Sequence, residues 1–158
     1  MFREMRRKKQ ELPRQECFEL LGKEKRGVLA VLGDGGYPYA VPVNFYFDAV
    51  EEKIYIHGAK EGHKIDAIRA CDKVCFTVYE QGVQDTGDWS YHVRSVVVMG
   101  RAEFVSDEDL AFEKARAMGL KYYPSAAEVD EELRKDFRRV QMLAITPEHM
   151  TGKRVHEK

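Results

Sequence analysis

The stretch GVLAVLGDGGYPYAVPVNFYFD (residues 27–48), followed by KIYIHG (residues 53–58), decides the fold. It opens with a compact apolar run of strand length, and Asp34-Gly35-Gly36 is a strong turn signal. Residues 37–48 then alternate, with apolar side chains at the odd positions from 39 to 47, as in a strand with one buried face. We therefore predict a three-stranded meander over residues 27–58.

Pro42 interrupts this otherwise regular alternation. Proline has no N–H group and removes one hydrogen bond from a sheet ladder. Its presence implies a sheet edge, a bulge or the approach of a ligand at this point of the strand.

The remaining elements follow from changes of period and from capping signals. We predict strands over residues 73–80 and 91–105, the latter bent near Gly100, and a short strand from residue 141 that precedes a tail over 154–158. Helices are predicted over residues 14–22, within 59–72, from 106 toward 118 and from 125 onward. Six strands with peripheral helices indicate an α+β barrel, mostly antiparallel.

Length and charge exclude several classes of protein. A chain of 158 residues forms one domain over residues 1–158, and a net charge of −1 gives no field that attracts nucleic acid. We interpret the basic residues 1–11 as a solvated arm, and no apolar run is long enough to span a membrane. Three cysteines without a scaffold spacing predict free thiols in a reducing cytoplasm.

The densest group of chemically active residues is HGAKEGHK (residues 57–64), where a strand is predicted to pass into a helix. Glycines allow a ligand to approach the backbone, a helix N-terminus favours an anion, and Lys60, His63 and Lys64 add positive charge. From these residues alone, a phosphate site and an ordinary surface turn remain equally open. The spacing is neither that of a Walker loop nor that of a Rossmann turn.

The succession of residues 27–48, 53–69 and 73–80, with RSVVVMGRAEFV and ITPEHMTGK later in the chain, resembles the FMN-binding split-barrel superfamily. This superfamily includes the pyridoxamine 5′-phosphate oxidases, and the chain is most similar to the branch of nitroimidazole-resistance proteins. The resemblance extends from about residue 13 to residue 153. It implies a six-stranded split β-barrel, FMN as cofactor, and a homodimer with the flavin at the subunit interface.

The same resemblance assigns roles to individual residues. It implies that the flavin ring lies beside Pro42, Val43 and Asn44, and that the phosphate lies against His57, Gly58, Lys60, His63 and Lys64. Trp89, Tyr91, Arg94 and Ser95 are expected to face the cofactor of the partner subunit. His57 is the catalytic candidate, since an imidazole that titrates near neutral pH can relay a proton.

The expected activity is an FMN-dependent oxidoreductase that takes hydride from NAD(P)H and reduces a small acceptor, as a nitroimidazole reductase does. A non-catalytic module for flavin or haem is the alternative from another class, with His57 or His92 as the haem ligand. A pyridoxamine phosphate oxidase-like enzyme is less favoured, since the chain ends TGKRVHEK without the arginine and tryptophan typical of that enzyme. No His or Cys group has a zinc-like spacing, so we predict no metal site.

Overall fold

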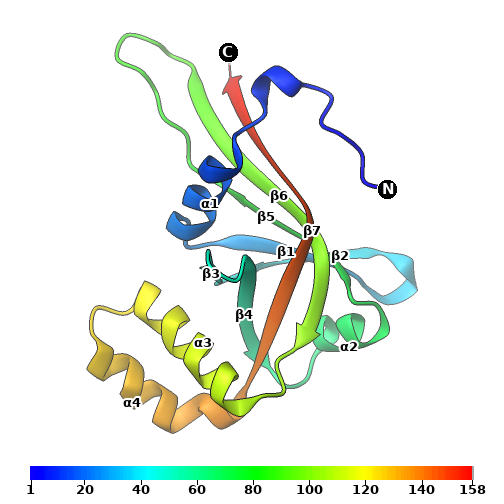
Figure 1. Cartoon of the computed structure of the whole chain (residues 1–158), viewed down its shortest axis with the longest axis vertical. Helices are drawn as coiled ribbons and strands as arrows, with labels where there is room; N and C mark the ends of the chain where they lie inside the picture. Colours follow the sequence, from blue (N-terminus) through cyan, green and yellow to red (C-terminus); the bar gives the residue numbers. More distant parts are fainter. Residues whose placement is uncertain (158) are drawn as a thin grey trace.

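The computed structural model describes residues 1–157 and is built around a seven-stranded sheet with antiparallel neighbours throughout (Figure 1). The strands are β1 (Gly27–Leu32), β2 (Pro38–Val43), β3 (Tyr46–Asp48), β4 (Lys53–Ala59), β5 (Lys73–Tyr79), β6 (Tyr91–Phe104) and β7 (Val140–Glu157). Their order across the sheet is β2-β1-β5-β6-β7-β4-β3. The consecutive strands β2 and β3 are therefore opposite edges, which is the arrangement of a split barrel. The predicted α+β split barrel is confirmed, with seven strands in place of six.

The seventh strand exists because the strand predicted over residues 37–48 breaks at Asn44 and Phe45. Phe45 is fully buried, and its backbone N–H donates to the Tyr122 hydroxyl at 3.0 Å. Its carbonyl oxygen accepts from the Lys121 ammonium, also at 3.0 Å. Side chains of a distant helix thus satisfy backbone groups that a neighbouring strand would otherwise bind.

Helices surround the sheet, and side-chain caps begin two of them. The helices are α1 (Arg14–Lys23), α2 (His63–Ala70), α3 (Glu108–Tyr122) and α4 (Ala126–Asp136), with short 3₁₀ turns at Lys8–Gln10, Asp34–Gly36 and Phe137–Arg139. Asp107 caps α3 by accepting from the Leu110 N–H, and Ser125 caps α4 by accepting from the Glu128 N–H. Within residues 1–157, no helix has the length and apolar character needed to cross a bilayer.

Two clusters of buried side chains make up the core. The larger fills the barrel, with Leu29, Phe76 and Val98 among its fully buried members. The smaller lies beneath α3 and includes Tyr55 and Met118. Figure 1 shows α3 and α4 as a pair beside β4 and the lower half of β7. The helix pair therefore forms a second layer outside the barrel wall.

Strands β6 and β7 form a long ribbon whose upper half extends beyond the barrel (Figure 1). Their pairing runs from Tyr91 opposite Glu157 to Phe104 opposite Leu143. The prediction of a tail over 154–158 was wrong for residues 154–157, which continue β7; residue 158 lies outside the described residues. Residues 154–157 are mostly polar and therefore carry little strand signal in the sequence. In the structure, β6 provides backbone partners for them up to the end of β7.

The predicted bend at Gly100 is confirmed. The β6–β7 register shifts between Met99 and Gly100, which is the mark of a β-bulge. A Cβ atom at Gly100 would collide with the carbonyl oxygen of Thr146 on β7. Glycine lets the two backbones approach closely where the ribbon turns from the barrel.

Candidate functional site

A cleft of about 420 Å³ lies between the barrel wall and the α3–α4 pair. Two of the predicted site residues, Asn44 and His57, line it. The remaining lining residues come from the loop before β1, from α3 and the residue after it, from α4 and the 3₁₀ turn that follows it, and from the start of β7: Lys25, Arg26, Ala115, Met118, Gly119, Tyr122, Tyr123, Val129, Glu132, Leu133, Asp136, Phe137 and Val140.

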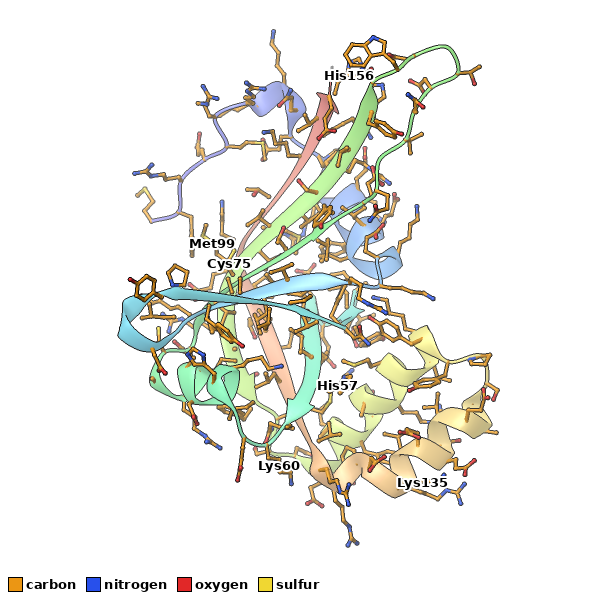
Figure 2. All side chains as sticks on the ribbon, turned by 180° about the vertical axis from the view of Figure 1, so that it is seen from behind. His57, Lys60, Cys75, Met99, Lys135 and His156 are labelled. Atoms are coloured by element: carbon orange, nitrogen blue, oxygen red, sulfur yellow. The ribbon has the colours of Figure 1, made fainter. Side chains whose placement is uncertain are left out.

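His57 points from β4 into this cleft (Figure 2). Its neighbour Ile56 is fully buried in the barrel, so the alternation of the strand turns His57 to the opposite face. The Nδ1 atom lies 2.8 Å from the Met118 sulfur. Partial burial, and then the Lys64 charge, lower the pKa of His57 below its ordinary value, so the imidazole is neutral at pH 7.

Lys64 lies in the first turn of α2, and its ammonium group is placed over Gly58. A Cβ atom at Gly58 would lie 3.1 Å from the ammonium nitrogen, so only glycine leaves this space open. Lys64 is half-buried, burial lowers its pKa, and no hydrogen bond or ion pair joins its side chain to another residue within 1–157. A half-buried cation without a partner fits an anionic ligand.

The start of α2 adds backbone donors next to Lys64. The N-cap residue Gly62 has a φ of 129° and provides no side-chain cap, so the first N–H groups of the helix are not satisfied by a capping side chain. Such N–H groups favour a phosphate or another anion.

The other two cationic candidates of this segment face elsewhere. Lys60 is exposed and lines a second cleft of about 660 Å³, together with Arg138 and Gln141. The His63 ring stacks on Tyr39 at 4.2 Å, and its Nε2 accepts from the Asp34 N–H at 3.1 Å. His63 therefore fastens the β1–β2 turn to α2.

Pro42 and Val43 end the edge strand β2, and Asn44 follows at the split of the barrel. Pro42 is exposed, while Val43 and Asn44 are half-buried. Of the three alternatives that Pro42 leaves open, the structure shows the sheet edge, because β1 is the sole strand partner of β2 among the described residues.

Tyr91, Arg94 and Ser95 belong to the upper half of the β6–β7 ribbon, away from His57, and Trp89 lies in the loop just before β6. Figure 2 marks this separation, since His156 labels the end of the ribbon and His57 lies below the barrel's middle. Trp89 is 74% exposed, and Tyr91 is also exposed. Arg94 is engaged by both carboxylate oxygens of Glu80 at 3.1 Å and by Glu16 at 3.4 Å. One chain alone therefore does not bring these four residues to the cleft.

The helical wall of the cleft was not predicted as part of a site. The sequence does predict Val129, Leu133, Phe137 and Val140 as one apolar stripe, and all four line the cleft. A stripe of this kind is the signature of ordinary core packing, so it carried no indication of a binding surface.

Comparisons with known proteins agree with this architecture. Among solved structures, a protein from Bacteroides thetaiotaomicron proposed to be a 5-nitroimidazole antibiotic resistance protein superposes with a TM-score of 0.76 and 21% identity, over 93% of this chain and 87% of its own. An FAD-binding protein from Mesorhizobium loti superposes with a TM-score of 0.68 and 25% identity, over 92% of this chain and 96% of its own. An FAD and heme binding protein from Mycobacterium smegmatis superposes with a TM-score of 0.72 and 21% identity, over 92% of this chain and 72% of its own.

No curated protein matches the sequence. The sequence profile of the pyridoxamine 5′-phosphate oxidase family, however, matches residues 13–154, which is nearly the whole chain. Together with the split barrel, this match shows that the chain belongs to the pyridoxamine 5′-phosphate oxidase family of flavin-binding split-barrel proteins.

Proposed function

We propose that the protein binds FMN at the junction of β4 and α2 and acts as an NAD(P)H-dependent oxidoreductase on a small acceptor. The observation that carries the proposal is the half-buried ammonium of Lys64, which lies against Gly58 without a partner within residues 1–157. Membership of a flavin-binding family supports a phosphate as the anion that Lys64 binds.

The residues present fit a flavin nucleotide. Lys64, Gly58 and the N–H groups at the start of α2 would hold the phosphate. Pro42, Val43 and Asn44 would flank the ring where the edge strand ends. When bound, the flavin supplies hydride and electron transfer.

His57 is the residue that we assign to proton transfer. It lines the cleft, and its lowered pKa keeps it neutral at pH 7, so that it can accept a proton or donate one. The helical wall formed by α3 and α4 would exclude water from the same cleft and give room for the acceptor.

We further propose a homodimer formed through the outer face of the barrel. Ala30, Cys75 and Met99 stand in register on neighbouring strands of this face, and Met99 is 43% exposed. Figure 2 shows Cys75 and Met99 next to each other at the middle of the sheet. Such pairing would bring Trp89, Tyr91 and Ser95 of one subunit toward the flavin of the other, while Arg94 stays with Glu80.

The nature of the cofactor is tested by releasing it from the purified protein and measuring its mass and visible spectrum. We expect the mass of FMN and flavin absorption bands. Some structural neighbours are named as FAD-binding proteins. Release of FAD would correct the identity of the nucleotide and leave the phosphate-binding role of Lys64 in place. A Soret band without flavin would overturn the proposal in favour of a haem module.

Lys64→Ala tests the site itself. We expect its flavin dissociation constant to rise at least about tenfold, because a charge-assisted contact to phosphate is lost. Lys135→Ala is the matched control, since Lys135 lies on the far side of α4 and pairs with Glu131 (Figure 2). Equal flavin affinity in the two variants would refute the phosphate role of Lys64.

The activity and the dimer need separate measurements. Reduction of the bound flavin by NADH or NADPH, followed by reoxidation with a nitroaromatic compound, would support the enzyme; a flavoprotein inert to both nicotinamides would favour a binding module.

The variant Met99→Asp tests the dimer. It is expected to be a monomer when its mass is measured by light scattering, and to bind flavin more weakly. A wild-type monomer that binds flavin fully would refute the interface.

A further inference from the structure

The end of the β6–β7 ribbon brings two histidines together. His92 on β6 and His156 on β7 are directly opposite each other in the ladder. The N–H and C=O groups of His92 both bond to Val83 on its other side, at 2.8 and 2.9 Å, so the histidine pair is a non-hydrogen-bonded pair of the β6–β7 ladder. Side chains approach most closely at such pairs. The two rings accordingly stack at 4.1 Å with 9° between their planes.

The loop that precedes β6 brings two carboxylates to the same place. Asp85 Oδ2 lies 3.2 Å from His92 Nε2, and Asp88 Oδ2 lies 3.3 Å from His156 Nε2. One donor atom from each of Asp88, His92 and His156 lies within 4.8 Å of the others.

Ser90 holds the loop in this position. It is 2% exposed, and both its N–H and its hydroxyl bond to Asp88 Oδ1, at 3.0 and 2.7 Å. The hydroxyl also contacts Nε2 of His156. Asp88 is thus fixed by backbone and side-chain hydrogen bonds, with its other oxygen turned to the histidines.

We propose that Asp85, Asp88, His92 and His156 bind a divalent transition-metal ion of the zinc class. In a tetrahedral zinc site with bonds of about 2.0–2.2 Å, donor atoms are roughly 3.3–3.6 Å apart, which is close to both His–Asp separations. The two stacked rings would turn about their side-chain torsions so that both Nε2 lone pairs point at the ion. Imidazole nitrogens select zinc, cobalt, nickel or copper over calcium and magnesium. The ion would replace the Ser90 hydroxyl as the partner of His156 Nε2. Ser90 would still hold Asp88 through its two hydrogen bonds to Oδ1.

The surroundings of the cluster give the ion access and a structural effect. A cleft of about 250 Å³ reaches His92 and His156 from the side of Gln10 and Arg154. Bound metal would join the loop before β6 to the end of β7, which Asp88 and Ser90 otherwise reach through their side-chain contacts with His156. The absence of a metal site was predicted from linear spacing, whereas this cluster assembles only when β7 pairs with β6.

Trp89 supplies a built-in reporter, since it is the sole tryptophan of the chain and follows Asp88 directly. Cobalt(II) added to the full-length protein at fixed flavin content should quench its fluorescence saturably, at one ion per chain, and give a visible absorption band. Zinc(II) should reverse both signals by competition.

The variants His92→Gln and His156→Gln are each expected to weaken cobalt binding by at least about tenfold, because loss of a direct ligand costs no less than loss of a supporting contact. His149→Gln is the matched control: His149 also lies on β7, stacks on Phe2 and is remote from the cluster. It should bind cobalt with the wild-type constant.

Two results would overturn the proposal: no saturable signal from the wild-type protein up to millimolar cobalt, or unchanged binding in the histidine variants. If those variants do not fold by circular dichroism, the loop variants Asp85→Asn and Asp88→Asn decide instead, with the same tenfold criterion. The measurement does not depend on the proposed flavin chemistry, and its failure would leave that proposal intact.

Discussion

The ammonium nitrogen of Lys114 lies 2.8 Å from Oδ2 of Asp48, and the side chain of Lys114 is only 5% exposed. A second carboxylate, Glu51, also lies 2.8 Å away. Asp48 ends β3, whereas Lys114 lies at the middle of α3. This buried cluster therefore fastens α3, which is one wall of the cleft, to the strand at the split of the barrel.

Lys114→Met should destabilise the protein. Removing one partner of a buried ion pair leaves the other charge without compensation, at a cost of about 3 kcal/mol in the free energy of unfolding. Urea denaturation measures this. Glu113→Ala is the control, because Glu113 also faces Lys114 but is 70% exposed, and its loss should stay within about 0.5 kcal/mol. Similar losses in the two variants would mean that the cluster does not fasten the helix.

The same cluster predicts a loss of stability in acid. Burial acts to raise the pKa of Asp48, but hydrogen bonds from Lys114 and from the N–H of Glu51 outweigh it and hold this pKa below its ordinary 3.8. The Lys114 hydrogen bond likewise lowers the pKa of Glu51 below 4.5. Groups with depressed pKa values stabilise the folded state above their unfolded pKa, and this stabilisation disappears as pH falls through the folded pKa.

Wild-type stability should therefore begin to fall near pH 4.5 and continue to fall below 3.8. Lys114→Met should show a shallower fall, since its carboxylates no longer gain from the ammonium. Urea midpoints measured at several pH values between neutral and acidic would test this. Parallel curves for the two proteins would assign the acid sensitivity to other carboxylates.

Tyr122→Phe should weaken the junction between α3 and the barrel. The Tyr122 hydroxyl accepts from the Phe45 N–H, and it lies within hydrogen-bond distance of the Lys25 carbonyl oxygen at 2.7 Å. Without the hydroxyl, the N–H of a fully buried residue has no partner, which costs about 1–3 kcal/mol. Tyr123→Phe, at the exposed neighbouring position, should be close to neutral in the same thermal or urea unfolding experiment.

Gly58→Ala should act on ligand binding and leave stability nearly unchanged. Its Cβ would meet the flexible end of Lys64 at 3.1 Å, which the lysine can avoid by moving its ammonium away from the anion site. Flavin affinity should fall while the unfolding free energy changes by less than about 1 kcal/mol.

Gly100→Ala provides the contrast to Gly58→Ala. There the Cβ would meet the backbone of Thr146, which cannot move aside, so a loss of about 1–3 kcal/mol is expected without a specific effect on flavin. Destabilisation by Gly58→Ala to the same extent would show that Gly58 is required by the fold and not by the ligand.

His57→Gln should lower the turnover number by about 10²-fold or more if the imidazole transfers a proton, with flavin occupancy retained. The wild-type rate should show an ionisation below pH 6.5, since burial and Lys64 lower the pKa of His57, and the variant should lack it. His149→Gln should keep both the rate and the pH profile. A rate loss in His57→Gln with an unchanged pH profile would assign His57 to positioning.

Local signals in the sequence were sufficient for much of the fold. The bend at Gly100 and the cap at Ser125 each depend on residues close together in the chain, and both occur. The meander predicted over residues 27–58 occurs only as two separate hairpins, β1–β2 and β3–β4, and the N-cap of α3 is Asp107, one residue after the predicted start at 106. The phosphate-loop candidates Gly58 and Lys64 also lie close together in sequence, and the structure brings the Lys64 ammonium over Gly58.

Only the tertiary structure decided the features that depend on distant partners. The strand breaks at Phe45 because Tyr122 and Lys121 bind its backbone, and the polar end of β7 remains a strand because β6 pairs with it. The same pairing places His92 beside His156, at the end of the ribbon that lies away from His57 (Figure 2). Sequence alone thus determined the approximate place of most strands and turns, because these depend on neighbouring residues. The break at Phe45, the full length of β7 and the choice of which side chains meet depended on strand register and helix packing, which join residues far apart in the chain.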